Sequence, residues 1–247
     1  MDEIYIHTNA HQLQLLVNER QYMAIEPDRI HDAVKSILAT LPPGVTLLAA
    51  AKTRSLEEVK AVITAGVTHI GYNYVQEALP IIQAVGSQAS WHMIGHLQRN
   101  KARVVVENFD LVETLDSLKL AHAIERYCEE TQKTLPVLLE INSGRESNKT
   151  GVLPEDVDEL VENFSALKFV RVEGLMTMGP LFGDPEASRP YFKTTREIYE
   201  RLSNVTTPNV EMRTLSMGMS NSYRVAIEEG ANLVRLGTAI FGARPVK

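Results

Sequence analysis

Lys52 is the residue of this sequence whose type and position first suggest a chemical role. It follows Leu47, Leu48 and the three alanines 49–51, at the end of an apolar run. A partly buried lysine amine can form a Schiff base with a carbonyl compound, because desolvation lowers its pKa. An aldolase and a pyridoxal-phosphate protein both use a lysine in this way. Position alone favours a solvent-exposed lysine just past a strand end, so other residues must support the chemistry.

Arg235 is the second residue with a chemical signal, because it stands inside the apolar run 233–236. A charge in such a run is costly unless it is paired or binds a ligand. Arg235 therefore belongs either to a structural ion pair or to a binding site. Gly237 and Thr238 follow directly and offer backbone N–H groups and a hydroxyl.

A third segment, Ser216-Met217-Gly218-Met219-Ser220, is again small and hydroxyl-bearing and directly precedes a helix-like stretch. Together these groups suit pyridoxal phosphate: its aldehyde would go to Lys52 and its pyridine nitrogen to Arg235. An arginine does not readily give up a proton, so that nitrogen would stay unprotonated and the ring would be a weak electron sink. The expected phosphate ligands are Ser216, Gly218, Gly237 and Thr238.

Eight short runs rich in aliphatic residues alternate with longer amphipathic segments. Nearly continuous apolar runs are typical of parallel strands covered on both faces. Eight of them, separated by helices, predict an α/β fold with a single (β/α)8 TIM-type barrel, which holds its chemistry at the carboxyl ends of its strands. The predicted strands are 46–52, 69–73, 90–95, 111–115, 137–142, 170–178, 214–219 and 233–241.

The alternative fold is a doubly wound open sheet, which normally has a glycine-rich turn after its first strand. Residues 52–55 read Lys-Thr-Arg-Ser, without glycine. This turn counts against an open sheet and against a dinucleotide site.

Local signals place the helices between these runs. A helix over about 27–40 precedes the first predicted strand. Ser55 and Glu58 have the spacing of a capping box, which predicts a helix directly after Lys52. Ser220 or Asn221 is expected to begin a helix that follows the seventh strand.

Length and composition limit the classes of protein to consider. The chain has 247 residues, of which 44% are hydrophobic and 23% charged, as in ordinary globular proteins. We expect one domain over 1–247, in which 1–25 form a partly helical extension without an assigned role. The net charge of −6 argues against a nucleic-acid partner. One cysteine, Cys128, excludes a disulfide framework and an all-cysteine zinc cage, and we expect no metal site.

Targeting signals are also missing from the sequence. No stretch approaches the ~18 apolar residues that span a bilayer, and the first ten residues contain two acids and no apolar signal-peptide core. We therefore expect a cytoplasmic protein without a membrane partner.

The sequence resembles the pyridoxal-phosphate homeostasis proteins, whose fold is similar to the N-terminal barrel of alanine racemase. The resemblance runs from about residue 25 to residue 244. Its longest motifs are Trp-His-Met-Ile-Gly-His-Leu-Gln at 91–98 and Leu-Ser-Met-Gly-Met-Ser at 215–220. The other matching segments are 50–53, 73–77, 99–101, 142, 149–151, 174–178 and 234–242.

This resemblance implies roles for individual residues. Lys52 would carry pyridoxal 5'-phosphate as a covalent internal aldimine. Asn73 would lie beside the ring and its phenolic oxygen, while His92 and Met176 would line the pocket. The other cofactor-binding residues implied are Ser216, Met217, Gly218, Arg235, Gly237 and Thr238.

One position departs from the family pattern. Residues 71–73 read Gly-Tyr-Asn, where the family commonly has Gly-Glu-Asn, so that Tyr72 replaces an acid. Neighbouring strand residues point to opposite faces of a sheet. We therefore expect Tyr72 to change packing outside the ring pocket and to leave the aldimine intact.

The resemblance implies a cofactor carrier and not an enzyme, with no catalytic residues. Such a protein buffers or delivers pyridoxal phosphate in vitamin B6 homeostasis, with effects on amino-acid and keto-acid balance. Its expected partners are the cofactor and pyridoxal-phosphate-dependent apoenzymes, and we expect a monomer.

The alternative is a pyridoxal-phosphate-dependent amino-acid racemase. Racemisation needs a base on each face of the α-carbon, and Lys52 could be one of them. Tyr72 and Tyr74 are the local candidates for the other base. Alanine racemases also carry a C-terminal β domain, for which the six residues after Phe241 leave no room. A third possibility, a class I aldolase, predicts a protein without a visible chromophore.

Overall fold

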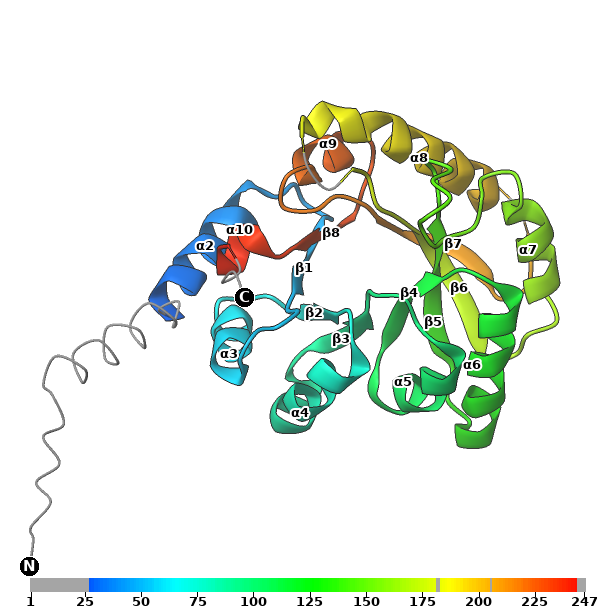
Figure 1. The fold of residues 1–247 in the computed structure, drawn as a ribbon, viewed down its shortest axis with the longest axis horizontal. Coiled ribbons are helices and arrows are strands. Elements are labelled where there is room, and N and C mark those ends of the chain that lie inside the picture. Colours follow the sequence, from blue (N-terminus) through cyan, green and yellow to red (C-terminus); the bar gives the residue numbers. More distant parts are fainter. Residues whose placement is uncertain (1–26, 181–182, 205, 244–247) are drawn as a thin grey trace, which may run out of the picture.

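The computed structural model describes residues 27–180, 183–204 and 206–243. Its eight strands close into one barrel in chain order, and all neighbours are parallel. Figure 1 shows the helices as a ring outside these strands. The strands are β1 (Thr46–Ala50), β2 (His69–Tyr72), β3 (Ser90–Met93), β4 (Leu111–Leu115), β5 (Leu135–Ile141), β6 (Val170–Thr177), β7 (Val210–Ser216) and β8 (Leu233–Leu236). The predicted (β/α)8 barrel is confirmed, while the expected extension 1–25 lies outside the described residues.

The helices follow the local signals closely. The helix predicted over 27–40 is α2, and the capping box is present: the Ser55 hydroxyl accepts from the Glu58 N–H, and the Ser55 N–H donates to the Glu58 carboxylate. The α-helices are α2 (Pro27–Thr40), α3 (Leu56–Thr64), α4 (Val75–Val85), α5 (Ala102–Asn108), α6 (Leu118–Thr131), α7 (Val157–Phe164), α8 (Arg189–Ser203), α9 (Tyr223–Glu228) and α10 (Thr238–Phe241). Short 3-10 helices are η1 (Gly86–Gln88), η2 (Arg99–Lys101) and η3 (Pro185–Ser188). Within the described ranges, no helix has the length and apolar character needed to cross a membrane.

Two boundaries differ from the sequence prediction. The helix expected from Ser220 or Asn221 starts later, at Tyr223. The strand predicted over 233–241 ends at Leu236, and α10 follows as a single helical turn. The N–H groups of Ile240 and Phe241 donate to the carbonyl of Gly237, which closes this turn. Apolar side chains alone did not distinguish a buried helical turn from a strand.

Apolar residues pack in two layers. The larger one lies between the sheet and the surrounding helices, and it includes Val34, Phe109, Phe164, Phe192 and Phe241. A small second cluster, Leu48, Ile94 and Leu233 with Ala50 against it, fills part of the barrel interior. The rest of the interior is polar, since Glu113, His92, Ser216 and Arg235 are all buried.

Tyr72 belongs to the outer layer, as strand alternation predicts. Its ring lies 6.5 Å from that of Trp91, centroid to centroid, among the buried apolar residues. Its hydroxyl is buried without a hydrogen-bond partner within the described part of the chain. Burial raises the pKa of the Tyr72 hydroxyl above its ordinary value, so this group is a poor base.

Candidate functional site

Lys52 lies in the turn that follows β1, and its side chain is half-buried. The next residue, Thr53, has a φ of 64°, and its N–H donates to the Glu77 carboxylate over 3.0 Å. The Lys52 amine lies 4.9 Å from the centroid of the exposed Tyr74 ring. Glu77 and Tyr74 both stand at the start of α4, so this helix holds the turn that presents the lysine.

Arg54 fixes the same turn to the end of the chain. It donates to the carbonyl of Gly242 over 3.2 Å and to the Glu58 carboxylate over 3.2 Å. Its guanidinium also lies 5.0 Å from the centroid of the Phe241 ring. The turn after β1 and the helix α10 are therefore held against each other, as the pairing of β1 with β8 also requires.

Ser220 marks the point where two backbone donors converge. Its hydroxyl accepts from the N–H groups of Gly237 and Ala239, each over 3.1 Å. These donors follow β8, beside the turn that carries Lys52. Two N–H groups that reach one oxygen form a suitable set for a phosphate oxygen. The donors available here fit the phosphate end of pyridoxal phosphate, and the Lys52 amine fits its aldehyde.

Gly218 allows the chain after β7 to pass close to α9. Its φ is +89°, and a Cβ there would lie 2.6 Å from the Cβ of Ala226 and 2.8 Å from the Cα of Tyr223. The Gly218 carbonyl accepts from the N–H of Arg235 over 3.1 Å. Glycine at 218 is thus explained by packing and by the register of β8, before any ligand is considered.

Ser216 and Arg235 meet inside the barrel. The Arg235 guanidinium donates to the Ser216 hydroxyl, and over 2.9 Å to the carbonyl of Thr177. The Ser216 hydroxyl donates in turn to Glu113 over 2.6 Å, and the Arg235 and Glu113 charges are 3.6 Å apart. Arg235 therefore has the structural ion pair that its position in an apolar strand requires. The hydroxyl that contacts the donors after β8 is that of Ser220, and Ser216 lies deeper.

His92 also lies deeper than its expected place at the pocket wall. Its Nδ1 is 2.7 Å from the Glu113 carboxylate, and its Nε2 is 3.0 Å from Nδ1 of His69. His92 is the third residue of β3, whereas the mouth lies beyond the end of that strand. His92 also lines a cavity of about 370 Å³ together with Ser90 and Leu111, which stand at the amino-terminal ends of their strands.

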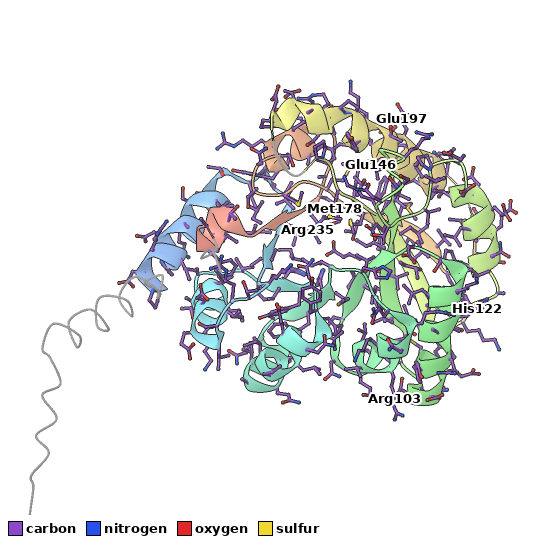
Figure 2. The ribbon with its side chains drawn as sticks, viewed as in Figure 1. Arg103, His122, Glu146, Met178, Glu197 and Arg235 are labelled. Atoms are coloured by element: carbon purple, nitrogen blue, oxygen red, sulfur yellow. The ribbon has the colours of Figure 1, made fainter. Side chains whose placement is uncertain are left out.

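The remaining predicted residues divide between the mouth and the core. Asn73 follows β2 and is half-buried, and its backbone carbonyl would lie 2.4 Å from a Cβ at Gly95. Met176 is buried inside the barrel, whereas Met217 packs in the apolar layer between sheet and helices. Met178 is 37% exposed. Figure 2 shows Met178 and Arg235 toward the centre of the strand ring. Thr238 is exposed at the first position of α10.

An open cleft of about 800 Å³ lies beside this mouth, at the carboxyl ends of β3, β4 and β5. Its lining includes His96, Asp116, Lys119 and Thr150. No group of three or more histidine, cysteine, aspartate or glutamate side chains suited to a metal ion occurs in the parts of the chain that the structure describes.

Glu140 is a buried carboxyl of the barrel with one oxygen unpartnered. Its Oε1 accepts from the Thr150 hydroxyl over 3.0 Å, while Oε2 has no hydrogen-bond partner in the described residues. Burial raises the pKa of Glu140, and the hydrogen bond from Thr150 opposes this rise only in part. The folded protein therefore holds a proton on Glu140 at pH values where the unfolded chain has lost it.

We expect Glu140→Gln to be more stable than the wild type at pH 8, by about 1 kcal/mol, because ionising a buried carboxyl is costly. Below the unfolded pKa the carboxyl is neutral in both states, and its stabilising contribution is lost as the pH rises through the folded pKa. The advantage of the variant should therefore shrink at pH 4. Urea unfolding at both pH values measures it, with the exposed Glu197→Gln on α8 as the control (Figure 2). A less stable variant at pH 8 would contradict the expectation.

Three functional neighbours were not found from the sequence. Glu113 had a signal, since a carboxylate stands in the middle of the buried strand Leu-Val-Glu-Thr-Leu. Ser220 lay within a matched motif, but nothing in the motif separates its role from that of Ser216. Glu77, which holds the turn after Lys52, is ordinary as a first-turn acid of a helix and gave no distinct signal.

Fold and site together define this chain as a barrel of the alanine racemase N-terminal class with a lysine at its mouth. The family model for the alanine racemase N-terminal domain matches residues 25–245. The chain belongs to the pyridoxal phosphate homeostasis protein family. It is 37% identical over 210 residues to the family member from Synechocystis sp., covering 84% of this chain and 95% of that protein. With the member from Aquifex aeolicus it shares 41% over 199 residues, covering 80% and 86%.

Solved structures agree with this assignment. PipY of Synechococcus elongatus with pyridoxal phosphate bound matches with a TM-score of 0.79 and 32% identity, covering 86% of this chain and 100% of that one. Alanine racemase from Clostridium difficile matches with a TM-score of 0.73 and 17% identity, covering 89% of this chain and 61% of the racemase. The second likeness concerns the fold alone.

Proposed function

We propose that this protein binds pyridoxal 5'-phosphate covalently at the barrel mouth and serves as a carrier of the cofactor. The observation that supports this most is the placement of three groups on or directly after the paired strands β1 and β8: the Lys52 amine, the N–H donors of Gly237 and Ala239, and the Arg235 guanidinium. The PLP-bound structure of PipY supports the same assignment. The Lys52 nitrogen would add to the aldehyde carbon, and water would leave.

The phosphate would bind at the N–H groups of Gly237 and Ala239, with the hydroxyls of Ser220 and Thr238 beside them. In the structure the Ser220 hydroxyl occupies both donors. We infer that the Ser220 hydroxyl rotates away from these two N–H groups, or shares them, when a phosphate binds. Ser216 would act from the barrel interior, where its hydroxyl accepts a hydrogen bond from Arg235 and so holds that side chain in place.

The ring would lie between Asn73 and Met176 of β6, with Arg235 toward its nitrogen. Bound pyridoxal phosphate supplies an aldehyde and an electron-accepting ring. Burial lowers the pKa of Arg235, and the charges of Glu113 and Glu140 oppose that change. Since an arginine stays protonated in proteins, Arg235 would not transfer a proton to the ring nitrogen. This electrostatic arrangement favours retention of the cofactor over carbanion chemistry.

The racemase alternative lacks support from the geometry around Lys52. Of its two local tyrosines, Tyr72 is buried in the outer apolar layer, away from the barrel interior. The Tyr74 ring lies directly beside the Lys52 side chain, with the Lys52 amine 4.9 Å from its centroid. Neither is arranged as an independent base across a substrate from Lys52. We propose that the protein has no turnover of its own.

Delivery to an apoenzyme tests this proposal directly. The loaded protein is mixed with a PLP-dependent apoenzyme in the presence of a phosphatase that destroys free cofactor. We expect the loaded protein to restore enzyme activity at least about fivefold better than the same amount of free cofactor, because the bound phosphate is shielded. Proton exchange at the α-carbon of amino acids in deuterated water is the second measurement. Rapid exchange with turnover would refute the carrier role and favour the racemase.

Other features of the carrier follow from the same proposal. We propose a monomer that acts as one domain over residues 1–247, in the cytoplasm. Its partners would be the cofactor and the apoenzymes that receive it, with no role for nucleic acid. Delivery would link the protein to vitamin B6 supply and to the amino-acid and keto-acid pools that depend on it.

A further inference from the structure

A chain of hydrogen bonds leads from Arg235 into the barrel, and the proposed binding of the cofactor does not by itself require all of it. Glu113 is completely buried, and both of its oxygens are occupied. Its Oε2 accepts from the Ser216 hydroxyl over 2.6 Å and faces the Arg235 guanidinium at 3.6 Å. Its Oε1 lies 2.7 Å from Nδ1 of His92. One carboxylate thus joins the arginine of the mouth to a histidine of the interior.

The chain continues from His92 to the opposite end of the barrel. Nε2 of His92 lies 3.0 Å from Nδ1 of His69, and the two rings meet edge to face with centroids 5.0 Å apart. His69 opens β2, and it lines a cavity of about 370 Å³ with residues from the amino-terminal ends of neighbouring strands. Lys52, in contrast, follows the carboxyl end of β1. The chain therefore spans the barrel from one end toward the other.

The charge on Glu113 decides where each proton of this chain lies. Burial opposes ionisation, but the contacts with His92, Arg235 and Ser216 outweigh it and lower the pKa of Glu113 below its ordinary value. A carboxylate only accepts, so Nδ1 of His92 must donate to it. In a neutral His92 the other nitrogen, Nε2, is then an acceptor, and Nδ1 of His69 donates to it. In both of these hydrogen bonds the donor therefore lies on the side of the amino-terminal cavity and the acceptor on the side of Glu113.

We propose that His69, His92 and Glu113 form a hydrogen-bonded relay, through which protonation of His69 at the amino-terminal end of the barrel weakens the hold of Glu113 on Arg235. This inference rests on the proposed function, because Arg235 carries the effect to the cofactor. A hydronium ion gives its proton to Nε2 of His69 and leaves as water, so that His69 gains a positive charge. Nδ1 of His69 still donates to Nε2 of His92, and Nδ1 of His92 still donates to Glu113. One N–H bond forms, one O–H bond of the hydronium ion breaks, and Glu113 keeps its negative charge.

The positive charge on His69 would polarise His92 toward Glu113 and so weaken the attraction of Glu113 for Arg235. The guanidinium would then act more strongly on the cofactor ring beside it, because a buried charge is poorly screened. His69, His92 and Glu113 are therefore positioning residues, which act on the cofactor only through Arg235. We therefore expect the spectrum of the bound cofactor to change with pH because His69, which lies far from Lys52, takes up a proton.

Other charged groups face His69 and set its proton affinity. Burial lowers the pKa of His69 most, followed by the neighbouring His92, while Glu113 and Asp110 oppose the change. The Asp110 carboxylate is held by the N–H of Trp91 over 2.8 Å. Arg213 also lines the cavity, where it pairs with Glu173 and Glu211. Protonation of His69 therefore takes place below its ordinary pKa.

The test compares absorbance titrations of three loaded proteins between pH 5 and 8. His69→Asn keeps an amide donor near the position of Nδ1, but the asparagine side chain does not take up a proton between pH 5 and 8. His122→Asn changes an exposed histidine on α6, which Figure 2 shows on the outer side of the barrel. We expect the wild type and His122→Asn to share one acid-induced spectral change. At equal cofactor occupancy, it should be at least threefold smaller in His69→Asn.

A second measurement needs neither the cofactor nor a variant. Nitrogen-15 NMR of the histidine rings in the cofactor-free protein should show His92 protonated on Nδ1 at pH 7. A proton on Nε2 of His92 would overturn the relay, as would an unchanged spectral titration in His69→Asn. Absence of any visible band in the wild type mixed with pyridoxal phosphate would instead refute the proposed function, and with it the link to the cofactor.

Discussion

Replacement of Lys52 by alanine should abolish the visible absorbance that the protein acquires from pyridoxal phosphate. In the proposed site the lysine amine is the nucleophile, and it is held at the barrel mouth by a turn that Glu77 and Arg54 fix. Without it the phosphate donors and Arg235 remain, so binding should weaken without vanishing. We expect about 100-fold weaker binding, which corresponds to about 2.7 kcal/mol. Absorbance and equilibrium dialysis measure the two effects separately.

A matched control distinguishes this site from other lysines. Lys60 lies on α3 with an exposed side chain, close in sequence to Lys52 but outside the mouth. Lys60→Ala should keep the full absorbance, and borohydride reduction should attach the cofactor to the peptide that contains Lys52. An unchanged spectrum in Lys52→Ala would contradict the site, whatever the control shows.

Replacement of Gly174 by alanine should destabilise the barrel more than any other change considered for this protein. Gly174 stands in β6 with a φ of +149°, and a Cβ there would lie 1.8 Å from the carbonyl oxygen of Thr214 in β7. Backbone strain and overpacking each cost about 1–3 kcal/mol, so we expect a loss of about 4 kcal/mol. The same two strands pair Met176 with Ser216, so cofactor binding should weaken as well.

The control for Gly174 is a glycine with strain but without a clash. Gly44 has a φ of +85°, and a Cβ there would meet nothing within 4 Å. Gly44→Ala should therefore cost only about 1 kcal/mol, from the backbone alone. Urea unfolding of both variants gives the comparison, and equal losses would show that the contact with Thr214 relaxes freely.

The barrel could be predicted from the sequence because its signal is local and repeated. Parallel strands covered on both faces are continuously apolar, and each of the eight strands overlaps a run recognised in this way. The last predicted strand, 233–241, is an exception, because the strand in the structure ends at Leu236. There apolar residues form the helical turn Thr238–Phe241, because a buried turn and a buried strand have the same composition.

Depth within the barrel could not be read from residue type. Ser216 and Ser220 stand four residues apart in one motif, yet the first lies beside Arg235 in the interior and the second meets the donors after β8. His92 differs from the prediction for the same reason. Alternation along a strand predicts whether a side chain points into or out of the barrel. Its height along the barrel axis depends on the stagger of all eight strands.

The sequence by itself determined the family, the barrel and the place of Lys52 directly after the first strand, since motifs and apolar periodicity are properties of short segments. Only the tertiary structure decided the partners of Arg235. Glu113 and Arg235 are 122 positions apart in the chain, and the closed barrel alone brings their charges to 3.6 Å. A buried charge must find its partner wherever the fold places it, and no local pattern records that partner.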